Sequence, residues 1–251
     1  MKPGTLVLVP NTLDQGAEAQ PLTAVLAHDV VCRAASLAHW AVEDARSARA
    51  FLKRVDALVP LAQPLQNTAI AELPRARKGS GDTVPAADWH ALLAPALQGH
   101  DLGLLSEAGL PAVADPGAAL VQAAHAAGVP VLPLPGASAL LLALAASGLN
   151  GQSFAFVGYL PQDLAARGVR IKELEALSRR VAQTQMIIET PYRNAAVLTA
   201  LLTSLSLTTR LSVSCGLTLP GGWTRSDSVA RWRAYPTDMP DRLPAVFAWL
   251  A

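Results

Sequence analysis

The sequence has 251 residues, of which 51% are hydrophobic and 16% are charged, which is enough apolar material for one large domain or two of ordinary size. Lys and Arg number 20 against 19 Asp and Glu, so the net charge of +1 excludes the strong overall field of a typical nucleic-acid or membrane-surface binder, although local basic patches remain open. Cys32 and Cys215 stand far apart, and the histidines lack metal-ligand spacing, which argues against disulfides and a metal site. The apolar runs are too short for a signal peptide or a membrane span, so we expect a soluble, cytoplasmic protein with no membrane partner.

The first half of the chain alternates short apolar runs with Ala- and Leu-rich segments of helical length. Asp44 stands where it can cap a helix, since apolar residues recur at helical spacing after it. The pattern predicts a strand in 5–10, a helix in 45–59, a short helix in 88–100, a strand in 101–107, a helix in 117–129, a strand in 129–136 and a buried helix in 137–148.

The same alternation resumes after the turn-forming residues 148–153. It predicts strands in 154–161, 184–190, 210–218 and 243–250, with helices near 167–180 and in 191–205. Alternation of this kind is typical of parallel sheets covered by helices. We therefore expect an α/β protein with two α/β domains, 1–150 and 151–251.

The polar segment 72–88 contains Arg75, Arg77 and Lys78 among glycines, which predicts a surface loop. It is either a solvated connector or a basic flap over a substrate.

Two stretches combine strand ends with small residues and prolines. In "LLSEAGLPAVADPG", residues 104–117, an acid at the end of the predicted strand is followed by Ala-Gly and two prolines, and "LPLPGASA", residues 132–139, repeats this character. Loops at the carboxyl ends of parallel strands expose backbone groups to ligands, so two such loops at one sheet edge predict a pocket. The phosphate-binding patterns G-x-G-x-x-G and G-x-x-x-x-G-K-[ST] are absent, which disfavours a nucleoside triphosphate and favours a zwitterionic nucleoside cofactor without phosphates.

Together with "FAFVGYLP", "IIETPYRN" and the upstream "AVEDARSARAFLKR", these loops resemble the tetrapyrrole methylase family. The resemblance is strongest to the branch that methylates a cytidine ribose of small-subunit ribosomal RNA. It implies an S-adenosylmethionine-dependent methyltransferase, two α/β domains with the cofactor in the cleft between them, and a homodimer. The sequence departs from the branch in the first loop, "VPNTLDQG", and in "SEAGLP", where Glu107 and Leu110 replace a shorter acid and a threonine.

Carried over by position, the resemblance implies a cofactor-binding set drawn from both halves of the chain. These residues are Glu107, Ala108, Gly109, Leu110, Pro111, Pro135, Gly136, Ala137, Ser138, Thr190, Gly216 and Leu217.

Glu43, Asp44 and Glu189 are the candidate catalytic acids, because a ribose hydroxyl reacts faster when a base takes its proton. Each has a structural alternative. Asp44 can cap a helix, Glu43 can pair with a surface base such as Arg46, and Glu189 can occupy a solvated rim or pair with Arg193.

For an RNA partner, basic and aromatic side chains are the candidate contacts, with a solvated surface as the alternative. The substrate-binding candidates are Arg46, Arg75, Arg77, Lys78, Tyr159 and Arg193. The favoured function is 2′-O-methylation of ribosomal RNA, with the ribosomal small subunit as partner. The alternatives are methylation of a tetrapyrrole or another small molecule, and a cofactor-binding module without transferase activity.

Overall fold

The computed structural model describes residues 2–14, 20–74 and 84–251. The chain divides into two compact units, Met1–Ala137 and Ser138–Ala251. The division lies before helix α6 (Ala139–Ser147), whereas the sequence placed the domain boundary after this segment, near residue 150. The reason is that the inner residues of α6 pack against the second sheet, in a cluster with Met186, Val246 and Ala248.

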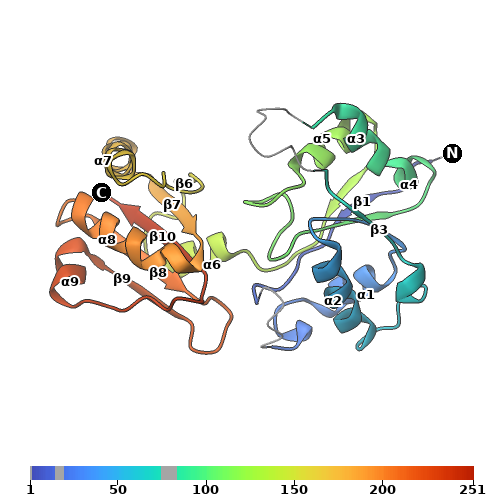
Figure 1. Ribbon diagram of the computed structural model, residues 1–251, viewed down its shortest axis with the longest axis horizontal. Coiled ribbons are helices and arrows are strands. Elements are labelled where there is room, and N and C mark those ends of the chain that lie inside the picture. Colours follow the sequence, from blue (N-terminus) through green and yellow to red (C-terminus); the bar gives the residue numbers. More distant parts are fainter. Residues whose placement is uncertain (1, 15–19, 75–83) are drawn as a thin grey trace. The chain divides into compact units, whose positions relative to one another are not determined.

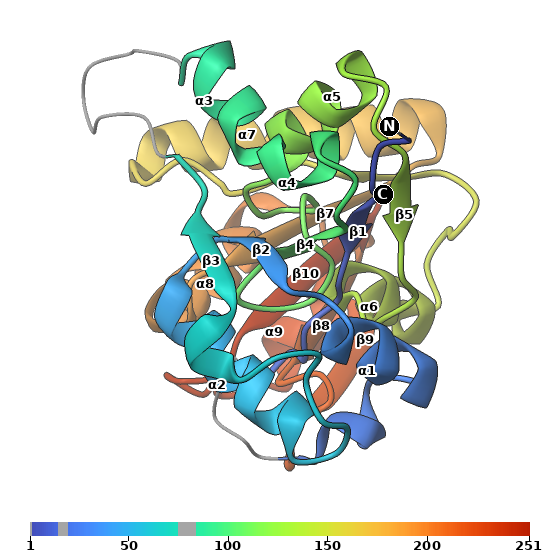
Figure 2. The ribbon, with the colours of Figure 1, turned by 90° about the vertical axis from the view of Figure 1, so that its right-hand side faces the viewer.

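The first unit is built on a five-stranded parallel sheet. Its order is β3-β2-β4-β1-β5, which Figure 2 shows across the sheet. The strands are β1 (Leu6–Leu8), β2 (His39–Val42), β3 (Ala69–Glu72), β4 (Leu102–Leu105) and β5 (Val131–Pro133). The parallel sheet confirms the prediction for this half of the chain, but strands β2 and β3 were not predicted. The short sequence of the edge strand β3, AIAE, shows no long apolar run.

Helices cover both faces of this sheet (Figure 1). The helices are α1 (His28–Ala35), α2 (Ala45–Asp56), α3 (Ala86–Leu92), α4 (Ala94–Leu97) and α5 (Ala118–Ala126), with 3₁₀ turns at Leu22–Ala24 and Leu65–Asn67. Side chains alternate between the two faces, as a pleated strand requires. In β1, Val7 packs in one core with α1 and α2, while Leu6 packs in another with α3, α4 and α5.

Local sequence explains where two of these helices begin. The carboxylate of Asp44 accepts a hydrogen bond from the backbone N–H of Ser47 at 2.7 Å, so Asp44 is the N-cap of α2. The helix predicted in 88–100 is instead two short helices, α3 and α4. The helix is split because the ring and the missing N–H of Pro95 would break a continuous helix. Pro95 instead lies in the first turn of α4, where a proline is tolerated.

The second unit has a mixed sheet in the order β6-β7-β10-β8-β9, of which only β6 and β7 pair in parallel. Its strands are β6 (Phe154–Phe156), β7 (Thr184–Glu189), β8 (Arg210–Cys215), β9 (Trp223–Ser228) and β10 (Ala245–Leu250). The prediction of a second parallel sheet is therefore wrong. The connection 216–222 is too short for a parallel crossover, and it returns the chain as an antiparallel neighbour. Strand β9, TRSDS after its tryptophan, was missed because it is largely polar.

The helices of the second unit lie on opposite faces of its sheet. Besides α6 they are α7 (Leu164–Val181), α8 (Asn194–Ser204) and α9 (Val229–Ala234), with a 3₁₀ turn at Pro191–Arg193. Residues of α7, α8 and α9 share one core with Ile187, Val213 and Phe247, and α6 covers the other face. The prediction that α6 is buried holds only for its inner side, since Leu141 is 53% exposed. No helix in the described part of the chain is long and apolar enough to cross a membrane.

Leu174 and Leu164 give a matched test of the core of the second unit, because both lie on α7. Leu174 is 2% exposed and Leu164 is 76% exposed. We expect Leu174→Ala to lower the free energy of unfolding by about 2–5 kcal/mol. Leu164→Ala should change it by less than about 0.5 kcal/mol. Urea denaturation followed by circular dichroism measures both, and equal losses would contradict the assigned packing of α7.

Candidate active site

The loops that follow β4 and β1 are hydrogen-bonded to each other at the carboxyl edge of the first sheet. The backbone N–H of Asn11 donates to the carbonyl of Gly109 at 2.8 Å, and the N–H of Gly109 donates to the carbonyl of Thr12 at 3.2 Å. The loop after β5 packs against the loop after β1. Gly136 lies so close to Pro10 that a Cβ built on this glycine would be 2.2 Å from the Cβ of Pro10. The two loops that the sequence singled out therefore meet at one sheet edge, with the loop after β1 between them.

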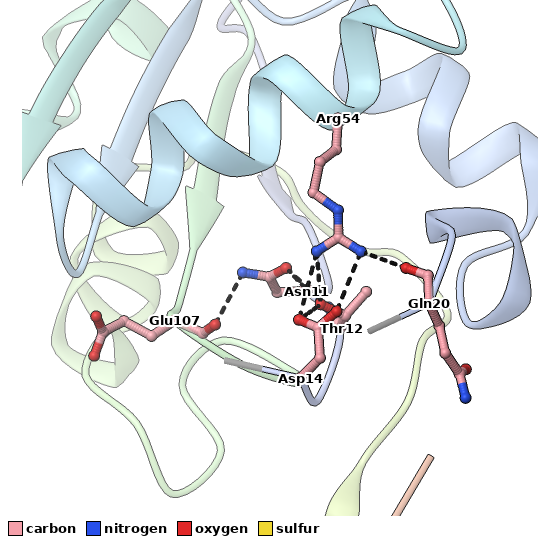
Figure 3. A network of polar contacts seen from close by, with 6 residues as sticks. All are labelled: Asn11, Thr12, Asp14, Gln20, Arg54 and Glu107. Atoms are coloured by element: carbon pink, nitrogen blue, oxygen red, sulfur yellow. Dashed lines mark hydrogen bonds and ion pairs between the residues drawn. The ribbon is translucent and has the colours of Figure 1, made fainter. Parts of the chain in front are cut away.

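The side chain of Asn11 extends this connection (Figure 3). Its amide Nδ2 donates to the carbonyl of Ser106 at 3.1 Å and to that of Glu107 at 3.0 Å. Asn11 is 5% exposed, so these hydrogen bonds satisfy carbonyls where the chain leaves β4. Sequence reasoning did not select Asn11. The available signal was its position directly after an apolar strand, in the stretch where the chain departs from the related branch.

A buried ion pair attaches the same loop to helix α2 (Figure 3). The guanidinium of Arg54 lies 3.2 Å from the carboxylate of Asp14, and their side chains are only 15% and 4% exposed. Asp14 also accepts a hydrogen bond of 2.6 Å from the hydroxyl of Thr12, and Arg54 donates to the carbonyl of Gln20 at 2.8 Å. A buried pair of this kind is tolerated because hydrogen bonds satisfy its remaining polar atoms. It places the loop after β1 at a defined position above the sheet.

The loop after β4 has an unusual backbone conformation. Gly109, Ala112 and Ala114 have φ values of +65°, +66° and +64°, and Gly117 has +128°. Positive φ is unfavourable for alanine by roughly 1–2 kcal/mol, so neighbouring contacts must hold residues 112 and 114 in place. The hydrogen bonds between Gly109 and the loop after β1 provide part of that support. The loop thus presents main chain and small side chains in a fixed shape.

Three acids lie near one another at this loop: Glu107 and Asp115, which belong to it, and Glu43. Glu43, directly after β2, accepts a hydrogen bond from the backbone N–H of Glu107 at 3.1 Å. Glu43 and Asp115 both line a pocket of about 330 Å³ in the first unit. Burial raises the pKa of Asp115 to about 7, and repulsion from the nearby charges of Glu43 and Glu107 adds to the effect. Asp115 was not among the predicted site residues, although it lies in the predicted loop 104–117. The signal was an acid placed directly before Pro-Gly at the start of a helix.

The other two acids proposed as catalytic have structural partners. Asp44 caps α2, as its alternative interpretation stated. The side chain of Glu189 is 1% exposed and lies 3.2 Å from Arg193, and its carboxylate accepts hydrogen bonds from the N–H of Thr190 at 2.8 Å and from its hydroxyl at 3.1 Å. Glu189 is therefore not at a solvated rim. The ion pair with Arg193 agrees with the second structural alternative given for Glu189. Both residues belong to the second unit.

The remaining candidates are spread over both units. Ser138 caps α6 by accepting a hydrogen bond from the N–H of Leu141 at 3.5 Å. Gly216 has a φ of +62° where the chain leaves β8, and Leu217 packs against the α6 cluster. Arg46 is exposed in the first turn of α2, and Tyr159 is 57% exposed. Arg75, Arg77 and Lys78 lie outside the described residues. No group of three His, Cys, Asp or Glu side chains that could hold a metal occurs within 2–14, 20–74 and 84–251.

Gly136 tests the contact between the loops after β5 and β1. We expect Gly136→Ala to destabilise the first unit, because the added Cβ would lie within 2.2 Å of Pro10 and one loop would have to move. Gly151→Ala is the control, since a Cβ at that glycine meets no heavy atom within 4 Å. Thermal unfolding measures both variants, and an unchanged midpoint for Gly136→Ala would contradict the close approach.

The titration of Asp115 gives a second test. Its folded-state pKa of about 7 lies above its ordinary value, so the folded protein holds a proton that the unfolded chain has lost. Asp115 therefore lowers stability progressively as the pH rises from about 4 to about 7. We expect Asp115→Asn to gain stability relative to the natural protein between pH 5 and pH 8, as measured by urea denaturation. A pH-independent difference between the two proteins would contradict the shift.

The family model of the tetrapyrrole (corrin/porphyrin) methylases matches residues 33–222, most of the chain. Ribosomal RNA small subunit methyltransferase I of Xylella fastidiosa is 44% identical over 107 residues, which are 43% of this chain and 38% of that protein. The protein of the same name from Synechocystis is 38% identical over 127 residues, covering 51% and 44%. The aligned segments thus span less than half the length of these relatives.

Solved structures share the fold at low sequence identity. The methyltransferase CobJ has a TM-score of 0.55 at 17% identity, covering 98% of this chain and 93% of CobJ. The conserved hypothetical protein APE0931 from Aeropyrum pernix K1 has a TM-score of 0.59 at 14% identity, covering 99% and 85%. With the family match across most of the sequence, these findings show that the chain belongs to the tetrapyrrole methylase family.

Proposed function

We propose that this protein is an S-adenosylmethionine-dependent methyltransferase that methylates a ribose 2′-hydroxyl of small-subunit ribosomal RNA. The observation that carries the proposal is the meeting of three loops after β4, β1 and β5, with Glu43 beside them. Membership of the family supports the reaction, and the names of the relatives support the acceptor. We further propose that the protein acts in the cytoplasm as a homodimer, as the family resemblance implies.

The first unit has the features that a folded, phosphate-free nucleoside cofactor needs. Gly136 has no room for a side chain toward Pro10, yet it is exposed, so a ligand can approach its main chain. The loop around Gly109 offers main-chain groups held by Asn11. The carboxyl group of Glu107 suits the positive sulfonium and ammonium groups of S-adenosylmethionine. We also propose that Thr190, Gly216 and Leu217 of the second unit bind the cofactor.

S-adenosylmethionine supplies an intrinsically reactive methyl group, so the protein mainly has to orient the reacting groups, an effect worth up to roughly 7–11 kcal/mol in well-aligned systems. Of the predicted acids, Glu43 lines the pocket of about 330 Å³ described above. We assign it the role of accepting the proton of the ribose hydroxyl. Asp44 holds the start of α2 beside it, and Glu189 forms its ion pair within the second unit, so both fit positioning roles.

Transfer of a labelled methyl group separates the candidate functions. The protein is incubated with tritiated S-adenosylmethionine and small ribosomal subunits from cells that lack the gene, and in parallel with a tetrapyrrole precursor. We expect label in the RNA, on a ribose after nuclease digestion. Label only in the tetrapyrrole would overturn the RNA assignment, and cofactor binding without any labelled acceptor would favour a binding module.

Two glutamates give a matched test of the proton acceptor. Glu43→Gln should lower the rate of methyl transfer by about 10²–10⁴-fold while calorimetry shows a nearly unchanged cofactor affinity. Glu72→Gln is the control, because Glu72 accepts a hydrogen bond from the N–H of Ala45 at 2.9 Å but does not line the pocket. Equal rates for the two variants would remove Glu43 from the proposed role.

A further inference from the structure

The carboxyl edge of the first sheet is divided into two parts. Residues 107–111 contact the loop after β1, which in turn meets the loop after β5, on the β4-β1-β5 side. The pocket of about 330 Å³ lies on the β3-β2-β4 side, where Glu43 follows β2, and Leu73 and Pro74 follow β3. Glu43 stands at the division, because it lines the pocket and also accepts the N–H of Glu107. The two parts are therefore neighbours that share one loop.

The lining of this pocket combines a flat aromatic ring with hydrogen-bonding oxygens. Trp89 of α3 is half-buried there, Leu73 and Pro74 add apolar surface, and Asp115 and Glu43 add carboxyl groups. Residues 117–119, at the start of α5, are Gly-Ala-Ala and leave space. Unstacked bases of RNA are bound in this manner, by stacking on an aromatic side chain and hydrogen bonds to the base edge. Carboxylates in particular accept hydrogen bonds from an exocyclic amino group such as that of cytosine.

Size and charge further limit the ligand. A volume of about 330 Å³ is at the lower end of the roughly 300–1,000 Å³ of small-molecule pockets, which suits a single base rather than a macrocycle. The raised pKa of Asp115 leaves this carboxyl partly protonated near neutral pH, which reduces the negative charge that RNA phosphates would meet. A protonated carboxyl also offers both a donor and an acceptor to a base edge.

We propose that this pocket binds one unstacked nucleobase with an exocyclic amino group, stacked on Trp89 and hydrogen-bonded to Asp115. The proposal rests on the proposed function, and it specifies how the RNA is held. The base lies next to the loops assigned to the cofactor, so its ribose can approach the methyl group. Trp89 is the residue that can separate binding of a base from binding of the cofactor, because it is aromatic, half-buried and outside those loops.

Tryptophan fluorescence tests binding without requiring methyl transfer. The chain has five tryptophans, of which Trp40, Trp232 and Trp249 are at most 1% exposed. Trp223 lies in β9 of the second unit and is not in the pocket lining, so a ligand in the pocket should mainly affect Trp89. The protein, saturated with S-adenosylhomocysteine, is titrated with short oligocytidine and oligouridine. We expect stronger binding and quenching with oligocytidine, and loss of the quenching in Trp89→Phe. Equal binding of the two oligomers, or quenching that persists in Trp89→Phe, would overturn the proposal.

Truncation of the ring measures its contribution. Trp89→Ala should weaken oligocytidine binding by about 5- to 150-fold, since stacking on an aromatic side chain is worth about 1–3 kcal/mol per base. His90→Ala, on the same helix but outside the pocket lining, should bind as the natural protein does. Calorimetry with S-adenosylhomocysteine checks that both variants fold and bind the cofactor product. Equal oligocytidine affinity in both variants would refute the role of Trp89.

The two proposals fail in different ways. Methyl transfer to ribosomal RNA with an unchanged KM in Trp89→Ala would reject the base pocket and leave the methyltransferase assignment intact. Oligocytidine binding that depends on Trp89, without methyl transfer to RNA, would support the pocket and reject the assigned reaction. Quenching of Trp89 by S-adenosylhomocysteine alone, unaffected by oligocytidine, would place the cofactor in the pocket and overturn the inference.

Discussion

The first unit depends on the hydrogen bonds through which Asn11 joins the ends of β1 and β4. Its amide donates to two successive carbonyls, and its backbone N–H donates to a third in the same loop. A buried amide that satisfies several backbone groups specifies one arrangement, because any other leaves polar atoms without partners. The ion pair between Arg54 and Asp14 then fixes this loop against α2. Loop positions at the site are thus set by groups that need not touch a ligand.

Crowding of negative charge is the second constraint on the site. Glu43 accepts a hydrogen bond from the backbone N–H of Glu107. Burial raises the pKa of Asp115 to about 7, and repulsion from the charges of Glu43 and Glu107 adds to the effect. Acids packed together in this way resist full ionisation, and perturbed pKa values of this kind are common at functional sites. A cation bound beside them would lower the pKa of Asp115, whereas a neutral base would leave the proton available for hydrogen bonding.

The second unit uses buried polar groups differently. Glu189 and Arg193 form an ion pair where β7 ends, and Thr190 satisfies the other carboxylate oxygen. Asn194, fully buried at the start of α8, donates to the carbonyl of Leu243 at 2.9 Å. These contacts hold the residues between β7 and α8 in a defined conformation. The same stretch contains residues that carried the family resemblance, which is consistent with a need for a precise loop shape.

The sequence alone determined the α/β class, most strands and helices, and the family, because apolar periodicity and ordered small-residue loops are local patterns. It also indicated the loops around Gly109 and Gly136. Tertiary structure decided the mixed pairing of the second sheet, since strand order depends on long-range hydrogen bonds. It likewise selected Asn11 and Asp115, and it buried Glu189 beside Arg193. Asn11 joins groups tens of residues apart in the chain, and the pKa of Asp115 depends on burial, which no local spacing encodes. The pairing of Glu189 with Arg193, four residues away, was already an alternative in the sequence, and tertiary structure decided only its burial.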